Sequence, residues 1–241
     1  MIENYDIQIK NLNYGILKDI NLYVPYRSKV GIVGKTGAGK TTLLNLLMKI
    51  YLPPRGTIFL GNKDILEIPD PEYKVLVGGV LQENFFFSTT IRENLQIPFF
   101  DFLDGLDEQK ILKALDFSSF DINEFPRKLE EIVGEKGVKL SGGQKERLAL
   151  ARSILKEPKI LVLDDSFANV DINTEREIQK NLIESDMTVI LASHRVIFMR
   201  DYDMIICIED GKITEIDTPE NLLSKDSVFR RFYEAIADWI G

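Results

Sequence analysis

The stretch KVGIVGKTGAGKTTLLNLLMKIY, residues 29–51, constrains the fold more than any other part of the chain. A β-type run, KVGIV, leads into Gly34-x-x-x-x-Gly39-Lys40-Thr41. Apolar residues then recur at three- and four-residue spacings and predict a helix, which the prolines of LPPRG end; these residues are Leu43, Leu44, Leu47, Ile50 and Tyr51. A strand, a glycine-rich turn and a helix in this order predict an α/β fold with a phosphate-binding loop.

The residue types of this loop suit a polyphosphate. Its glycines let backbone N–H groups curl around the phosphates, and the helix N-terminus adds partial positive charge. Lys40 can neutralise the β- and γ-phosphates, and the Thr41 hydroxyl can ligate Mg²⁺. The alternative is a glycine-rich turn that matches the pattern by chance. The candidate phosphate-binding residues here are Gly34, Lys35, Thr36, Gly37, Ala38, Gly39, Lys40, Thr41 and Thr42.

Two carboxylates follow a second apolar run, ILVL at residues 160–163, which is typical of a parallel strand buried on both faces. Asp164, at the carboxyl end of this strand, is a candidate Mg²⁺ ligand. Asp165 would face the γ-phosphate and the attacking water as a candidate catalytic residue. Alternatively, both acids begin a solvated loop or cap a helix.

The single histidine of the chain, His194, follows a third predicted strand, Thr188 to Leu191. A lone histidine is usually structural. At the end of a core strand beside a phosphate site, it could instead hydrogen-bond the γ-phosphate or orient the water. Lys40, Asp165 and His194 are therefore the catalytic candidates.

Composition narrows the classes of function. Thirty basic and 38 acidic side chains give a net charge of −8, so we expect no nucleic-acid partner. The one cysteine, Cys207, lies in the apolar run MIICIED and is expected to be a buried thiol, which fits a reducing, cytoplasmic setting. No apolar run approaches the ~18 residues that span a bilayer, and the start does not read as a signal peptide. Any membrane-spanning part is expected to lie elsewhere.

The motif LSGGQ at residues 140–144 gives the chain a family resemblance. Ser141 and Gln144 have the spacing of a helix-capping box, the two glycines keep the approach to the turn open, and apolar residues stripe the helix behind: Leu148, Ala151 and Leu155. Together with the phosphate loop, this motif resembles the nucleotide-binding domain of an ABC transporter.

The resemblance covers nearly the whole chain and implies its architecture. We expect one ABC-type domain over residues 1–241, with the RecA-like parallel core of P-loop NTPases. Residues 1–83 and 144–241 are expected to form this core together with an antiparallel β region near the N-terminus. A helical lobe is inserted at 84–143, with helix signals at Thr90-x-x-Glu93 and in DEQKILKALDF.

The resemblance also implies a partner. In this family two such domains stack head to tail with ATP between them, so Ser141, Gly142, Gly143 and Gln144 would contact ATP bound to a second ABC ATPase domain. Tyr14 matches the aromatic residue that stacks on adenine, although it could simply be a half-exposed strand tyrosine. Gln82 matches a glutamine that touches Mg²⁺, although it could be only a polar loop residue. Asp171 matches a loop that communicates across the dimer.

Three features refine this expectation. The segment EIVGEKGVKLSGG and the C-terminal tail resemble exporters, whose ATPase domains act at the cytoplasmic face of the cell membrane on a transmembrane domain, usually a fused one. Asp165 stands where the family places a catalytic Glu, and its carboxylate is one methylene closer to the backbone. We therefore expect slow hydrolysis at this chain's own site, and a heterodimer whose other subunit supplies the Glu.

Three alternatives remain at this stage. The chain could be a stand-alone ATPase subunit of an ABC importer, which the exporter-like loop makes less favoured. It could be a chromosome-maintenance ATPase, but no coiled-coil heptads lie between residues 83 and 140. It could be a small GTPase or kinase, since GNKDI at 61–65 superficially suggests guanine recognition, but the spacing is wrong and the LSGGQ motif has no place in that class. No residue indicates what an exporter built on this chain would transport.

Overall fold

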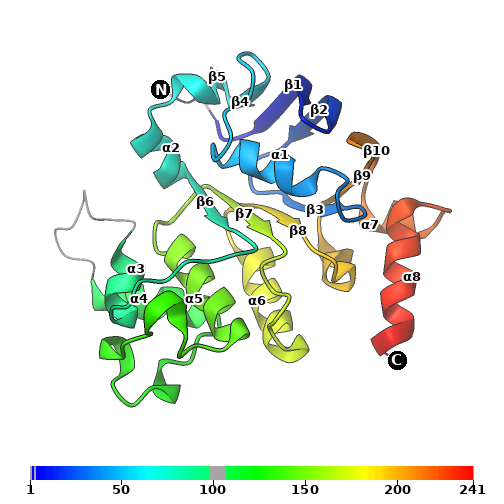
Figure 1. Cartoon of the computed structure of the whole chain (residues 1–241). Coiled ribbons are helices and arrows are strands. Elements are labelled where there is room, and N and C mark those ends of the chain that lie inside the picture. The colour runs from blue at the N-terminus through cyan, green and yellow to red at the C-terminus, as the bar shows by residue number, and fades with distance from the viewer. Residues whose placement is uncertain (1, 3, 98–106, 241) are drawn as a thin grey trace.

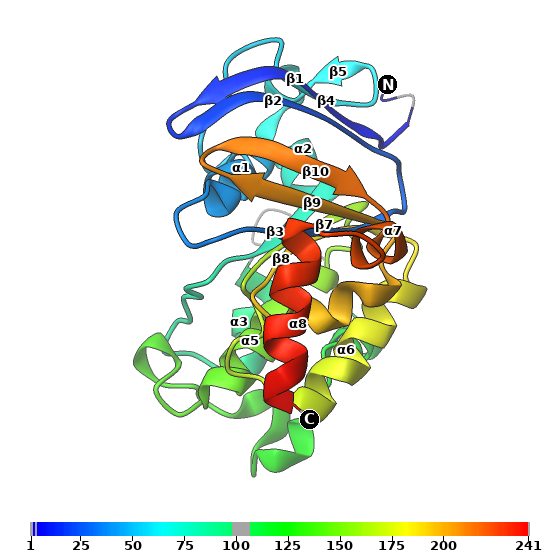
Figure 2. The same cartoon turned by 90° about the vertical axis from the view of Figure 1, so that its right-hand side faces the viewer.

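A computed structural model describes residue 2, residues 4–97 and residues 107–240, with the backbone only at 237–240. The chain folds into two stacked sheets with one helix between them and the remaining longer helices on the far face of the larger sheet (Figure 1; Figure 2). The predicted α/β class is confirmed.

The larger sheet supplies the parallel core. Its strand order is β10-β9-β3-β8-β7-β6, and every neighbouring pair is parallel except β10 with β9. The three predicted core strands appear as β3, β7 and β8. The bounds are β3 Lys29–Val33, β6 Val77–Val80, β7 Ile160–Asp164, β8 Thr188–Ala192, β9 Met204–Glu209 and β10 Lys212–Asp217.

The smaller sheet is antiparallel, in the order β2-β1-β4-β5, and is the β region expected near the N-terminus. Its apolar face, α1 and one face of the larger sheet share a single core. The bounds are β1 Ile7–Tyr14, β2 Leu17–Val24, β4 Ile58–Leu60, β5 Lys63–Asp64 and α1 Lys40–Leu47.

Helix α1 is shorter than its apolar pattern predicts. It ends at Leu47, and Lys49 adopts a left-handed conformation with φ of 53°. The N–H groups of Ile50 and Tyr51 both donate to Asn45 O, at 2.9 and 3.2 Å, which closes the helix end. Both side chains are exposed. The prediction that the helix reached Tyr51 is wrong, because these two residues continue its spacing without being buried.

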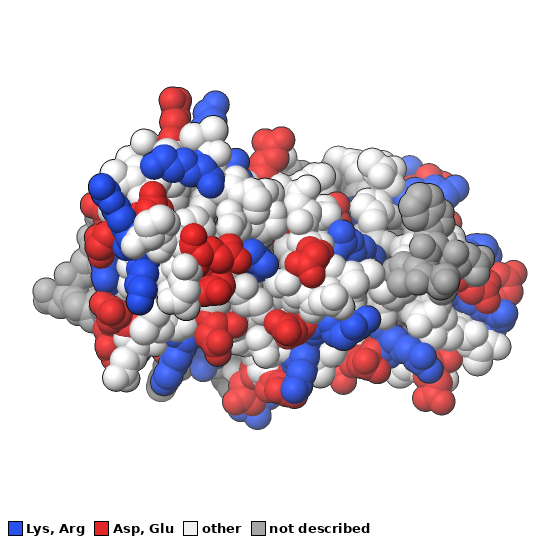
Figure 3. Space-filling model, turned by 90° about the horizontal axis from the view of Figure 1, so that it is seen from below, with Lys and Arg blue, Asp and Glu red and all other residues white. Residues whose placement is uncertain are grey.

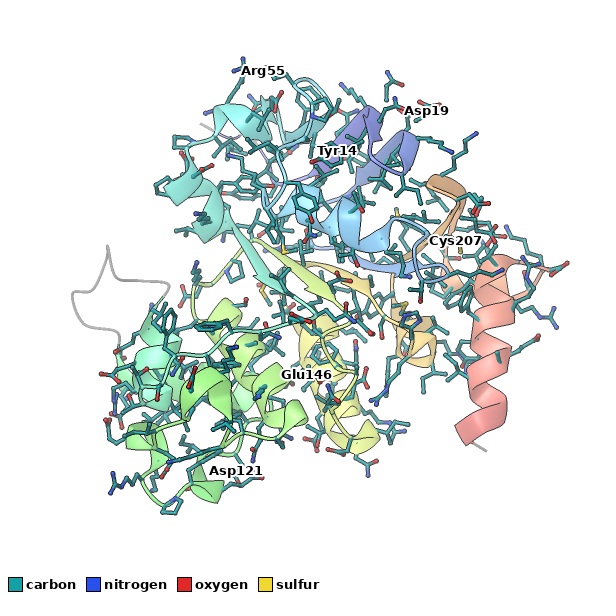
Figure 4. All side chains as sticks on the ribbon, viewed as in Figure 1. Tyr14, Asp19, Arg55, Asp121, Glu146 and Cys207 are labelled. Atoms are coloured by element: carbon teal, nitrogen blue, oxygen red, sulfur yellow. The ribbon has the colours of Figure 1, made fainter. Side chains whose placement is uncertain are left out.

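Alternation along the core strands explains how the larger sheet is covered on both faces. On β7, Ile160 and Val162 face α1, while Leu161 and Leu163 face the helices of the other side. Cys207 on β9 is fully buried and free, as predicted (Figure 4). The remaining helices are α2 Asp70–Leu76, α3 Ile91–Gln96, α4 Glu108–Phe117, α5 Gly142–Ile154, α6 Ile172–Glu184, α7 Pro219–Leu223 and α8 Val228–Ile240.

Between β6 and α5 the described residues form α3, α4 and short 3-10 turns, in the region where a helical lobe is predicted. The capping box predicted at Thr90 and Glu93 begins α3. The connection predicted within NLQIPFFDFLDGLDEQ lies largely outside the described residues. None of the described helices is long and apolar enough to cross a bilayer.

Candidate functional site

The residues of the predicted phosphate loop, the predicted Mg²⁺ ligands and the predicted catalytic residues gather where four neighbouring parallel strands end. Strands β6, β7, β8 and β3 are adjacent, and polar residues follow the carboxyl end of each. Such an edge is where open α/β sheets bind ligands. The described lining of the cleft at this edge consists of Ile16, Thr36, Gly37, Gly39, Lys40, Thr41, Thr42, Gln82, Asp164, Asp165, Ala192, Ser193 and His194.

The loop between β3 and α1 is held tightly by its neighbours. A Cβ on Gly34 would lie 2.2 Å from Ile208 O, so only glycine fits beside β9. The Lys40 ammonium donates to Gly34 O at 2.6 Å and to Lys35 O at 3.1 Å. Burial lowers the pKa of Lys40, which the carboxylates of Asp164 and Asp165 oppose. A cationic group therefore sits inside a loop that is already shaped for an anion.

Asp164, Thr41 and Gln82 bring oxygen ligands into the same cleft. Asp164 is buried and hydrogen-bonds Thr41. Burial raises the pKa of the Asp164 carboxyl, while Thr41 opposes the rise, so a cation beside it would favour the ionised form. Among the described residues, no group of three or more His, Cys, Asp or Glu side chains could hold a metal. The donor set fits Mg²⁺, which binds one or two carboxylates and completes its shell with phosphate oxygens and water.

Asp165 is half-buried at the entrance of the linker between β7 and α6. Its φ is 44°, a left-handed conformation that Asp adopts more readily than most residues. Its backbone N–H donates to Ala192 O at 2.8 Å, which fixes it to the end of β8. The side chain of His194, from the loop after β8, is exposed and lines the same cleft.

The turn formed by Ser141, Gly142, Gly143 and Gln144, called here the signature turn, has the predicted capping box. The Gln144 N–H donates to Ser141 Oγ at 3.1 Å, and the Ser141 N–H donates to Gln144 Oε1 at 2.8 Å. These four residues lie outside the described lining of the cleft.

Its glycines have a contact that the sequence did not reveal. A Cβ on Gly142 would lie 2.9 Å from Asn169 Cβ, and one on Gly143 would lie 2.8 Å from Asn169 O. The two glycines therefore pack against Asn169 of the same chain. This contact requires glycine at both positions, in addition to any need to keep the turn open to a ligand.

Tyr14 ends β1 and stacks on Tyr51, with ring centroids 6.2 Å apart and an interplanar angle of 19° (Figure 4). The described lining of the cleft includes Ile16 but not Tyr14. Sequence reasoning missed Ile16, Ala192 and Ser193 as lining residues, because an apolar or small side chain carries no chemical signal by itself.

The cleft is also small for a complete ligand site. Its volume is about 250 Å³, below the roughly 300–1,000 Å³ of pockets that enclose a small molecule. The arrangement offers a cradle for phosphates, oxygen ligands for a divalent cation, and a carboxylate and an imidazole beside them. It has the features of one wall of a nucleotide site.

Comparison with known proteins supports this interpretation. The family model described as "ABC transporter" matches residues 17–168. A solved structure of a bacterial Atm1-family ABC exporter with ATP bound superposes with a TM-score of 0.91 and 30% sequence identity. That superposition covers 98% of this chain and 43% of the exporter chain.

Curated relatives include two bacterial transport proteins. The chain is 39% identical over 220 residues to the probable multidrug resistance ABC transporter ATP-binding/permease protein YheI of Bacillus subtilis, covering 90% of this chain and 37% of that protein. It is 36% identical over 242 residues to the alpha-hemolysin translocation ATP-binding protein HlyB of Escherichia coli O157:H7, covering 95% and 34%. The chain thus spans little more than a third of the length of these relatives.

Proposed function

Because this chain belongs to the ABC transporter family, as an ATPase domain of the exporter type, we propose that it is the motor of an ABC exporter. ATP binding and hydrolysis at the cleft drive a transmembrane domain, either separate or upstream in the chain. The observation that carries the proposal is the meeting in one cleft of Lys40, which begins α1, Asp164, which ends β7, and His194, which follows β8.

The loop of residues 34–39 holds the triphosphate in this proposal. Its backbone N–H groups and the N-terminus of α1 supply hydrogen bonds and partial positive charge. Lys40 adds a full positive charge at the β- and γ-phosphates. Thr41, Asp164 and Gln82 would hold Mg²⁺, which would neutralise phosphate charge.

Hydrolysis depends on Asp165 and His194. Asp165 accepts a hydrogen bond from the attacking water and orients it, and His194 contacts the γ-phosphate. The shorter Asp side chain holds its carboxylate back from the position a Glu would reach. A misplacement of about 1 Å costs on the order of 10²-fold in rate, or roughly 2.7 kcal/mol. This chain's own site is therefore proposed to bind ATP and turn it over slowly.

A second ABC ATPase domain completes each site. The signature turn lies outside the chain's own cleft, and the cleft is small for a whole ATP site; both observations support binding of the partner's ATP by residues 141–144. Tyr14 is proposed to stack on adenine, and Asp171, which caps α6, to take part in the contact between subunits. We favour a heterodimer in which the other subunit supplies a Glu in the place of Asp165.

An exposed apolar patch supports docking to a transmembrane domain. Its members are Phe85, Phe87, Ile132 and Val138. The two segments that carry them are bridged: the Val133 N–H donates to Thr89 O at 3.0 Å, and Thr90 pairs with Ile132. Four exposed apolar side chains on two bridged segments are typical of a protein contact surface. The proposed place of the domain is therefore the cytoplasmic face of a membrane.

Surface charge gives no support to a nucleic-acid role. On the face that is lowest in Figure 1, acidic and basic side chains are intermingled (Figure 3). The net charge of −8 also disfavours binding to a polyanion.

The test of the proposed function uses the full chain and its Asp165→Glu variant. We expect both to bind a fluorescent ATP analogue, and the variant to hydrolyse ATP faster in the assembled ATPase. Lys40→Ala should bind the analogue far more weakly. Lys35→Ala keeps the backbone N–H of the loop and alters only an exposed side chain outside the described lining of the cleft, so it should bind nearly as well as the wild type. Failure of the wild type to bind ATP would refute the proposed function; an unchanged rate in Asp165→Glu would refute only Asp165 as the limiting defect.

A further inference from the structure

The linker of residues 166–170 joins β7 to α6, and charged side chains hold much of its backbone. The Arg195 guanidinium donates to Val170 O at 2.7 Å and to Ala168 O at 2.9 Å. Glu146 accepts from the Asn169 N–H at 3.0 Å and from Asn169 Nδ2 at 2.7 Å. Three consecutive residues are thus held by two side chains of opposite charge.

The side chains that hold the linker come from two different parts of the fold, the helix behind the signature turn and the loop after β8. Glu146 lies on α5, in the helix that begins at the signature turn (Figure 4). Arg195 directly follows His194, and it also forms an ion pair with Glu175 on α6. Glu146 is 6% exposed and Glu175 is fully buried. Charge-assisted hydrogen bonds of this kind, at sites with little water, are stronger and more specific in geometry than surface ion pairs.

The linker residue Asn169 also packs against the signature turn. As described above, neither Gly142 nor Gly143 leaves room for a methyl group beside Asn169. The turn, Asn169 and Glu146 therefore form one contact surface, and Arg195 holds the two residues that flank Asn169.

We propose that Glu146, Arg195 and Glu175, called here the clamp, are positioning residues that make the signature turn and the strand-end groups Asp165 and His194 move as one unit. The proposal rests on the proposed function, in which the turn serves the partner's ATP and the strand ends serve the chain's own ATP. Through the clamp, a shift at one nucleotide is passed within this chain to the other.

The route is short and continuous. From His194 it runs to Arg195, and from there through the carbonyls of residues 168 and 170 to Asn169. Asn169 touches the glycines of the turn and hydrogen-bonds Glu146. Packed and hydrogen-bonded elements of this kind pass on a displacement rather than absorbing it.

The decisive experiment is amide hydrogen–deuterium exchange on the full chain. Arg195→Ala alone would leave Glu175 buried without its partner, so the test variant is the double substitution Arg195→Ala with Glu175→Gln. We expect exchange to rise at least about 10-fold in residues 141–146, which Arg195 does not contact among the described hydrogen bonds. Exchange that rises only within residues 166–175 would overturn the proposal.

Matched variants separate the clamp from general destabilisation. Arg200→Ala with Glu177→Gln removes one exposed arginine and one exposed glutamate from the same two elements, and should leave residues 141–146 protected. Glu146→Gln keeps an oxygen that can accept from Asn169 and should restore much of the protection lost in Glu146→Ala. Equal loss in Glu146→Gln and Glu146→Ala would count against the Glu146 contact as a positioning contact.

A kinetic split gives a second readout. In the assembled ATPase we expect the double variant to lower kcat about 10-fold or more, with the KM for ATP within about two-fold of the wild type. A rise in KM with unchanged kcat would overturn the proposal, because the clamp would then act on ATP binding alone. If the wild type fails to bind a fluorescent ATP analogue, the proposed function fails; if it binds and the exchange stays local, only the clamp fails.

Discussion

At the scale of single residues, burial sets the chemistry of Glu175. Burial raises the pKa of this carboxyl to about 7, against the opposing hydrogen bond and charge of Arg195. The negative charge of Glu146 raises the pKa of Glu175 further. Tyr202 also packs at this site, where its hydroxyl donates to Gln179 Oε1. A carboxyl with this pKa titrates in the range where enzymes are assayed.

This shift predicts how stability depends on pH. Between the unfolded pKa of Glu, about 4.3, and about 7, the folded chain binds a proton at Glu175 that the unfolded chain releases. Raising the pH through this window therefore lowers the stability contributed by Glu175, by on the order of 3–4 kcal/mol in total. Urea unfolding of wild type and Glu175→Gln at pH 5 to 8 should show the variant gaining relative stability as the pH rises. Glu177→Gln is the control, and parallel curves for wild type and Glu175→Gln would contradict the prediction.

Gly143 offers a second residue-scale prediction, in which two effects have opposite signs. Alanine is the better helix former, so Gly143→Ala should stabilise α5 by about 1 kcal/mol on propensity alone. Its methyl group would meet Asn169 O at 2.8 Å, and overpacking of this kind costs about 1–3 kcal/mol. Because the obstacle is backbone, we expect a net loss of stability. A stabilised variant in urea unfolding would show that the linker yields easily.

At the scale of elements, capping predicts the stability of α3. The Glu93 N–H donates to Thr90 Oγ1 at 3.1 Å, and the Thr90 N–H donates to Glu93 Oε2 at 2.9 Å. Thr90→Ala removes the side-chain acceptor and should lower the free energy of unfolding by about 1 kcal/mol. Ser88→Ala, at an exposed position just before it, should have almost no effect. Equal unfolding curves for the two variants would mean that α3 frays without affecting the global transition.

Signals carried by local chemistry predicted these elements well. The capping boxes at Thr90 and Ser141 begin their helices as expected, and the apolar runs at 160–163 and 188–191 form core strands. The end of α1 could not be predicted, because Ile50 and Tyr51 keep the helical spacing although the chain turns left-handed at Lys49. Periodicity shows where apolar residues recur, and only the tertiary structure decides whether they are buried.

The candidate site likewise has a part that the sequence predicts and a part that only the structure shows. Glycine, lysine and paired carboxylates at strand ends are visible in the sequence, and the sheet brings them together because the carboxyl ends of parallel strands share one edge. The contacts of Asn169 with Glu146 and with the signature glycines join segments about 25 residues apart. Nothing in a single sequence indicates such a pairing, so the clamp is visible only in the structure.

At the scale of the whole molecule, ATP should stabilise the fold, because the proposed ligand binds groups from four strand ends that come together only when the sheet forms. A ligand that binds only the folded state adds about 2.7 kcal/mol at a concentration of 100 Kd. For a domain of this size that corresponds to a rise in Tm of roughly 5–10 °C. Thermal unfolding with ATP and Mg²⁺ should show this rise in the wild type and in Lys35→Ala.

Two variants sharpen this prediction by separating binding from hydrolysis. Asp165→Asn should keep the rise in Tm, since Asp165 is proposed to act on the attacking water and not to hold the nucleotide. Lys40→Ala should lose it, because the ammonium held by Gly34 O and Lys35 O is proposed to carry the charge that meets the phosphates. If Lys40→Ala showed the full rise, the nucleotide would have to bind away from this loop, and the cleft at the strand ends would no longer be the site.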